Sequence, residues 1–137
     1  MQTEKIFPAT DAAYIDASAW LEETLEQLEC PMKLIMQISM CFEEAFINIA
    51  HYAYGKDTGD MTFGISYDKG IVTLCLKDHG VAFDPTAKTD PDITAGMEER
   101  DIGGLGIFLV KEMMDSVTYQ RIDNENILTF AKKIKDE

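Results

Sequence analysis

The sequence predicts a two-layer α+β sandwich, in which a mixed, mostly antiparallel sheet carries three main helices on one face. Hydrophobic periodicity gives the segment order β-α-α-β-β-loop-α-β-β, so the strands come in runs instead of alternating with helices. The length of 137 residues indicates a single domain over residues 1–137, which is long enough to bury a core. Hydrophobic residues make up 46% of the chain and charged residues 27%, as in ordinary globular proteins.

The first strand is expected over residues 3–8, where Pro8 ends it. Thr10 or Asp11 can cap the helix that follows, which is expected near 11–29. Apolar residues recur in this helix at helical spacing: Tyr14, Ala17, Leu21, Leu25 and Leu28.

A second helix is expected from Pro31, a residue suited to a first helical turn, to about Tyr54, just before Gly55. Its apolar face consists of Leu34, Ile38, Cys41, Phe42, Ala45 and Ile49. A hairpin follows, in which alternating apolar residues flank the turn Asp68-Lys69-Gly70. The alternating residues are Met61, Phe63, Ile65 and Tyr67 before the turn and Val72, Leu74 and Leu76 after it.

Residues 84–102 are polar and lack periodicity, and a loop of that length in a compact domain is usually functional. A glycine-led helix is expected next, with a buried stripe made of Ile107, Val110 and Met114. Two strands, over 116–122 and 126–133, close the chain around a turn at Asp123-Asn124-Glu125.

The net charge of −13 and the pI near 4.4 exclude nucleic-acid binding through counterion release and disfavour an acidic membrane surface. The three cysteines show no Cys-x-x-Cys spacing and are expected to be buried free thiols in a reducing cytosol. The two histidines are isolated, so no zinc cluster is expected. With no leader-like start and no apolar run of membrane-spanning length, a cytoplasmic protein is expected.

Glu44 and Asn48 lie four residues apart and therefore share one face of the second helix. An amide oxygen can bind Mg²⁺, and a carboxylate one turn away can accept a hydroxyl proton. The same pair also fits an ordinary solvated polar stripe.

Asp78 ends the second hairpin strand and Gly80 follows it. A carboxylate there can accept a hydrogen bond from the exocyclic amine of adenine, and the glycine lets the backbone approach a flat ring. A plain strand-ending turn explains the same residues.

Gly103, Gly104 and Gly106 place three glycines in four positions before an apolar helix. Glycine lowers helix stability, so the cluster needs a reason. Binding of phosphate by backbone N–H groups is one reason, and a hinge or close packing is the other.

Taken in order, these segments resemble the N, G1 and G2 boxes of the GHKL ATPases, within which the chain looks most like bacterial anti-sigma factor serine/threonine kinases. The motifs are Glu-x-x-x-Asn, Asp-x-Gly-x-x-Phe-Asp-Pro and Gly-Gly-Leu-Gly-Ile-Phe-Leu-Val. The resemblance runs from about residue 34 to the end and includes Met114-Asp115 and Asn126-Ile127-Leu128. It implies the ATP-binding (Bergerat-type) fold, ATP and Mg²⁺ as cofactors, and a non-Walker nucleotide site.

The resemblance also implies roles for individual residues. Asn48 would bind Mg²⁺, Glu44 would be the general base, and Asp78 would hold the adenine amine with Gly80 beside the ring. The nucleotide site would further include Phe83, Arg100, Gly103, Gly104, Leu105 and Gly106. The segment 86–102 would be the ATP lid, in which Arg100 would either meet the terminal phosphate or remain an ordinary exposed residue.

One position departs from the family pattern. Members often carry a histidine four residues after the box asparagine, but Tyr52 occupies that place here and His51 comes one residue earlier. His51 is therefore assigned no role and is expected to be a packing or surface residue.

Two functions are consistent with this resemblance. The first is an anti-sigma kinase that transfers the γ-phosphoryl of ATP to a Ser or Thr of an antagonist protein, and that holds a sigma factor when the antagonist is phosphorylated and released. The second is an ATP-gated protein-binding module with little or no phosphoryl transfer. A fragment of a histidine kinase is disfavoured, because both histidines lie inside or beside the nucleotide motifs. A homodimer is implied by the resemblance alone.

Overall fold

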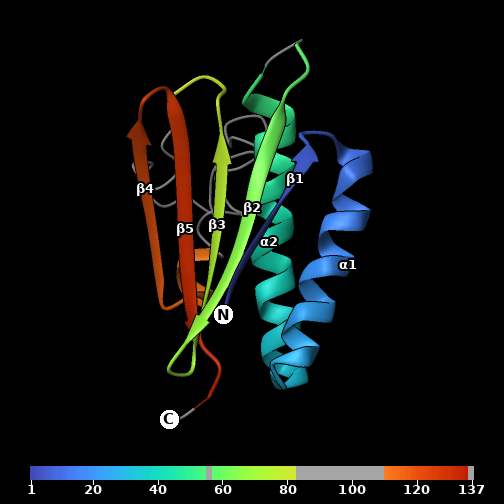
Figure 1. The fold of residues 1–137 in the computed structure, drawn as a ribbon, viewed down its shortest axis with the longest axis vertical. Helices are drawn as coiled ribbons and strands as arrows, with labels where there is room; N and C mark the ends of the chain where they lie inside the picture. The colour runs from blue at the N-terminus through green and yellow to red at the C-terminus, as the bar shows by residue number, and fades with distance from the viewer. Residues whose placement is uncertain (55–56, 83–109, 136–137) are drawn as a thin grey trace, which may run out of the picture.

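The structure, a computed structural model, describes residues 1–54, 57–82 and 110–135. Helices α1 (Asp11–Gln27) and α2 (Met32–Tyr52) lie on one face of a five-stranded sheet (Figure 1). The strands are β1 (Gln2–Pro8), β2 (Asp60–Asp68), β3 (Ile71–Asp78), β4 (Ser116–Ile122) and β5 (Glu125–Lys133). Their order across the sheet is β1-β2-β3-β5-β4, and each of the four pairings is antiparallel.

The two-layer α+β architecture and the five expected strands are confirmed. Helix α2 ends at Tyr52, two residues before the expected end, and Gly55 lies outside the described residues. Residues 110–113 are helical and agree with the end of the third expected helix, whose start falls outside the described part of the chain. The lid segment 86–102 also lies outside it.

Local sequence signals explain where α1 begins and where the two hairpins turn. The side-chain oxygen of Thr10 accepts a hydrogen bond from the backbone N–H of Ala13 at 3.2 Å, which caps the N-terminus of α1 as expected. The β2–β3 turn places Lys69 and Gly70 at positive φ, and the β4–β5 turn does the same with Asp123 and Asn124. Two central residues at positive φ match the right-handed twist of the flanking strands, so both turns fix the strand register.

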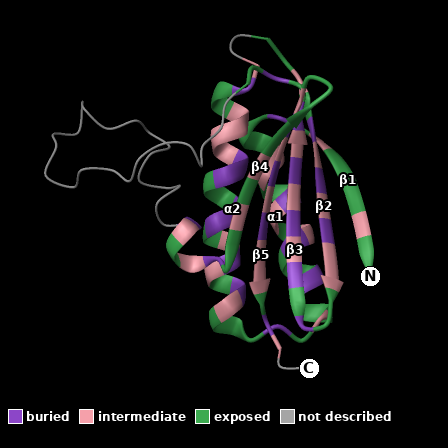
Figure 2. Cartoon of the chain, turned by 90° about the vertical axis from the view of Figure 1, so that its left-hand side faces the viewer, coloured by how far each residue is buried: buried purple, intermediate pink, exposed green. Residues whose placement is uncertain are grey.

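The core lies between the helices and the inner face of the sheet. Inward-facing residues of β2, β3 and β5 are buried and alternate with partly exposed ones (Figure 2). The rings of Phe42 on α2 and Phe63 on β2 stack with their centroids 4.4 Å apart, and Trp20 of α1 meets Phe63 edge-on at 5.2 Å. These aromatic contacts set the position of α2, which carries the first sequence motif, over the sheet.

The three cysteines are free thiols, as expected, and Cys30 and Cys41 are buried. Burial raises the pKa of the Cys41 thiol to about 11, so this thiol is protonated at neutral pH. The expectation of burial was wrong for Cys75, which is only partly buried. Strand alternation is the reason: Leu74 and Leu76 face the helices, and Cys75 between them faces the other side of the sheet.

Within the described ranges, none of the helices has both the length and the apolarity that a membrane crossing needs.

Candidate nucleotide-binding site

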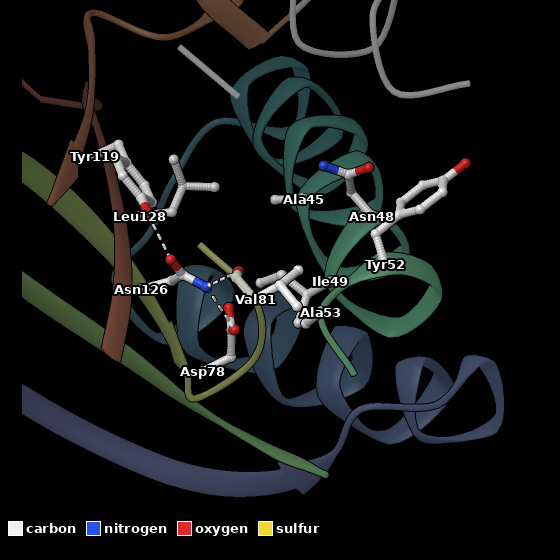
Figure 3. A pocket seen from close by; sticks show the side chains of 10 residues that line it. All are labelled: Ala45, Asn48, Ile49, Tyr52, Ala53, Asp78, Val81, Tyr119, Asn126 and Leu128. Carbon is white, nitrogen blue, oxygen red and sulfur yellow. Dashed lines mark hydrogen bonds between the residues drawn. The ribbon is translucent and has the colours of Figure 1, made fainter. Parts of the chain in front are cut away.

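A pocket opens between α2 and the adjacent ends of β3, β4 and β5 (Figure 3). The space between its walls, counted out into the open solvent at its mouth, is about 410 Å³. Its walls are mostly apolar, with a few polar side chains grouped at the sheet end and others on the helix. The lining residues are Ala45, Asn48, Ile49, Tyr52, Ala53, Asp78, Val81, Tyr119, Asn126 and Leu128. An apolar slot with a few fixed polar groups is the usual form of a small-molecule site.

The structure brings together two of the residues that the sequence singled out. Asn48 of α2 is half-buried and points into the pocket from the helix side, and Asp78 at the end of β3 lines the opposite wall (Figure 3). Asp78 is 4% exposed. It is buried because it continues the inward-facing series of Val72, Leu74 and Leu76 along β3.

Glu44 does not line this pocket, although it lies on the same helix, one turn before Asn48. Its side chain is exposed, and its pKa is raised by partial burial and, secondarily, by the neighbouring charge of Glu43. A raised pKa makes a carboxylate a stronger proton acceptor near neutral pH.

Close packing against the end of α2 requires a glycine at position 80, and the sequence did not reveal this requirement. A Cβ atom at this position would lie 2.1 Å from the backbone oxygen of Ala53, at the C-terminal end of α2. The same oxygen accepts a hydrogen bond from the N–H of Val81 at 2.7 Å. The glycine therefore lets the segment after β3 pack closely against the end of α2. The predicted approach of Gly80 to a flat ring stays a prediction.

Tyr54 provides a second link between α2 and the sheet. Its hydroxyl donates to the backbone oxygen of Asp60 at 2.6 Å and accepts from the N–H of His79 at 2.9 Å. Burial raises the pKa of this phenol, which keeps the donated proton in place. The ring leaves no room for a Cβ at Gly59, where such an atom would lie 2.3 Å from the ring.

Asn126 and its neighbours form a polar network on the sheet side of the pocket. Asn126 is 6% exposed and donates to Asp78 Oδ1 at 3.0 Å, while Tyr119 and Arg121 of β4 donate to its own side-chain oxygen. Sequence reasoning missed this network. The alternation along β5 could have revealed it. Leu128 and Phe130 face the core, so Asn126, two residues before Leu128, is a polar residue on the same inward face.

The remaining predicted site residues lie outside the described part of the chain. They are Phe83, Arg100, Gly103, Gly104, Leu105 and Gly106. His51, which was assigned no role, is a partly exposed residue whose Nε2 lies 2.8 Å from Asp11 Oδ1, so it links the end of α2 to the start of α1.

Comparison with known proteins identifies the family of the chain. Residues 7–132 match the histidine kinase-like ATPase domain. The chain belongs to this family. A similar relative is the serine/threonine-protein kinase BtrW of Bordetella bronchiseptica, which is 30% identical over 124 residues that cover 90% of this chain and 84% of that protein.

Two further similar proteins share less of their length with the chain. The serine-protein kinase RsbW of Bacillus cereus is 30% identical over 100 residues, which cover 69% of this chain and 61% of that protein. A crystal structure of the RsbU and RsbW domains of a Mycobacterium tuberculosis protein superposes with a TM-score of 0.71 at 14% identity, covering 98% of this chain and 32% of that one. The structural likeness shows the fold, and the named relatives are protein kinases of the same family. Membership in an ATPase family implies the use of ATP.

Proposed function

We propose that this protein is a cytoplasmic anti-sigma kinase, which binds ATP with Mg²⁺ and transfers the γ-phosphoryl group to a Ser or Thr of an antagonist protein. The observation that carries the proposal is one pocket lined by both Asn48 and Asp78, in a chain whose relatives are named serine/threonine-protein kinases. A sigma factor is the proposed second partner, and the protein is proposed to act as a homodimer.

The adenine base is assigned to the apolar slot between α2 and the sheet. Ala45 and Ile49 offer an apolar wall on the helix side and Leu128 offers one on the sheet side. Asp78 on the sheet side is the proposed acceptor for the exocyclic amine of the base. A flat apolar ring with one polar edge matches a slot with polar groups at one end.

The phosphates and Mg²⁺ are assigned to the helix side of the pocket. Asn48 presents an amide there, and its oxygen is a suitable ligand for Mg²⁺, which often takes one or two protein ligands and fills the other positions with phosphates and water. Gly103, Gly104, Leu105 and Gly106 are proposed to hold the phosphates through backbone N–H groups, with Phe83 and Arg100 completing the site.

Glu44 is proposed as the general base that accepts the proton of the attacking hydroxyl. It precedes Asn48 by one helical turn, which places it beside the proposed metal site. Phosphoryl transfer depends mainly on positioning and charge neutralisation, and the raised pKa of Glu44 favours the acceptance of a proton.

The neighbouring charge of Glu43 gives a testable pH dependence. The base works only when deprotonated, so transfer falls as the pH drops through the pKa of Glu44. Because Glu43 raises that pKa, Glu43→Gln should lower it and move the acid limb of the pH–rate profile to lower pH. Initial transfer rates over a pH series measure this, with Glu26→Gln on α1 as a matched exposed control that leaves the limb in place. A limb that stays in place or moves to higher pH in Glu43→Gln would contradict the role of Glu44.

The function itself is tested with the wild-type protein. It should bind ATP in a Mg²⁺-dependent manner by calorimetry, co-purify from its host with a small antagonist and a sigma factor, and phosphorylate that antagonist on Ser or Thr. Protein that fails to bind ATP would overturn the proposal.

A second candidate is the ATP-gated binding module. One observation favours it: among the described residues, the exposed Glu44 is not one of those that line the pocket. Protein that binds ATP and the partners but transfers no phosphoryl group to the antagonist would select this function.

A further inference from the structure

Asn126 occupies the centre of a row of residues that crosses three strands. Strand register pairs it with Asp78 of β3 on one side and with Arg121 of β4 on the other. The side chain is 6% exposed and lines the pocket, with Tyr119 above it (Figure 3). A polar side chain at this depth must satisfy its hydrogen bonds within the protein.

All four hydrogen-bonding positions of the Asn126 amide are used. Its nitrogen donates to Asp78 Oδ1 at 3.0 Å and to the backbone oxygen of Val81 at 2.8 Å. Its oxygen accepts from the hydroxyl of Tyr119 and from Arg121 Nη1, the latter at 3.0 Å. One end of the amide faces only acceptors and the other faces donors, so its orientation is fixed.

This amide separates a cation from a carboxylate. A guanidinium in direct contact with a carboxylate tends to form a bidentate pair that occupies both oxygens. Here Asn126 lies between Arg121 and Asp78, and Arg121 Nη1 bonds the backbone oxygen of Gly80 at 3.0 Å as well. The amide therefore takes up only one oxygen of Asp78.

The backbone uses the same oxygen of Asp78. The N–H of Gly80 donates to Oδ1 at 2.9 Å, alongside the bond from Asn126. Among the described residues, neither of these two donors reaches Oδ2. The carboxylate is thus held in one orientation by Oδ1, with its second oxygen free of both bonds.

We propose that Asn126 is a positioning residue that sets the base selectivity of the pocket. It holds Asp78 by Oδ1 and keeps Oδ2 as an acceptor for the 6-amino group of adenine, while Tyr119 and Arg121 hold Asn126 itself. The proposal rests on the proposed role of Asp78 in ATP binding. It predicts that the selectivity for an amino group at position 6 depends on the hydrogen bonds that orient Asp78.

Asn126→Ala tests this through a ratio of two affinities. The probes are ATP and purine riboside triphosphate, which differ only in the 6-amino group, each with Mg²⁺. The wild type should bind ATP more tightly by about tenfold or more, since hydrogen bonds to charged groups are worth that much. In Asn126→Ala the ratio should fall several-fold, because only the N–H of Gly80 then holds the carboxylate and its oxygens can turn, while the affinity for purine riboside triphosphate stays within about threefold.

The ratio of the two affinities distinguishes loss of positioning from general damage to the pocket, because general damage would weaken the binding of both triphosphates alike. Tyr119→Phe removes one of the two donors to the Asn126 oxygen and should lower the ratio in the same direction but by less. If circular dichroism shows that Asn126→Ala is unfolded, Tyr119→Phe tests the role of Asn126 in its place. Gln120→Ala is the matched control, since Gln120 is an exposed residue between Tyr119 and Arg121 on the same strand.

The outcomes distinguish this inference from the function on which it rests. A wild-type protein that prefers ATP, with the same preference in folded Asn126→Ala and Tyr119→Phe, overturns the role of Asn126 and leaves the proposed function standing. A wild type that binds neither triphosphate overturns the proposed function and this inference with it. A ratio that falls in both variants and holds in Gln120→Ala supports the inference.

Discussion

Glu44→Gln is expected to leave ATP binding unchanged and to lower phosphoryl transfer to the antagonist by about 10²–10⁴-fold, the usual contribution of a general base. The substitution keeps the shape of the side chain and removes its ability to accept a proton. Glu44 is exposed and does not line the pocket around Asn48 and Asp78, so nucleotide affinity should not depend on it. Calorimetry of ATP binding and single-turnover transfer rates measure the two quantities separately.

Glu43→Gln is the matched control for this experiment. It makes the same chemical change one residue earlier on the same exposed surface. At a pH well above the acid limb of the wild-type pH–rate profile it should transfer phosphoryl groups at the wild-type rate. Transfer that is equally fast in Glu44→Gln would remove this residue as the base and favour the binding module.

Asp78→Asn should invert the preference of the pocket between 6-amino and 6-oxo purines. The two donors that end on Asp78 Oδ1 come from Asn126 and Gly80, so the amide oxygen of the variant is expected to take that place. The amide nitrogen then faces the base and repels the amine of adenine. ATP affinity should fall by about 100-fold, or about 2.7 kcal/mol.

Inosine triphosphate provides the counterpart measurement, because its 6-oxo group accepts a hydrogen bond. It should bind Asp78→Asn more tightly than it binds the wild type. Titration of both nucleotides into both proteins, in the presence of Mg²⁺, gives the four dissociation constants. Parallel weakening of ATP and inosine triphosphate would show that Asp78 acts on the pocket as a whole and does not read the base.

Much of the fold was predictable from the sequence because its signals are local. Alternating apolar residues identified the β2–β3 hairpin, and Thr10 and Pro8 marked the first strand-to-helix junction. The end of α2 was less predictable. That helix stops at Tyr52, and the tertiary hydrogen bonds of Tyr54 and Ala53, which no local pattern announces, fix the chain that follows.

The candidate site was predictable to the extent that single residues carry its chemistry. Asn48 and Asp78 were found by type and spacing, and both line the pocket. No site role was predicted for Asn126 or Arg121, because their role depends on strand register, which places residues far apart in the sequence opposite each other. Gly80 also has a packing role that no local pattern indicates, since its close neighbour among the described residues is the backbone of Ala53.

The hydrogen bonds of Tyr54 and Ala53 affect how a ligand is received. They tie the C-terminal end of α2 to the segments that flank β2 and β3, so the wall with Asn48 and the wall with Asp78 are joined by direct bonds. A base that enters the slot meets two surfaces whose separation is already set. Little conformational entropy is then lost on binding at this end of the pocket, which is the advantage of a preorganised receptor.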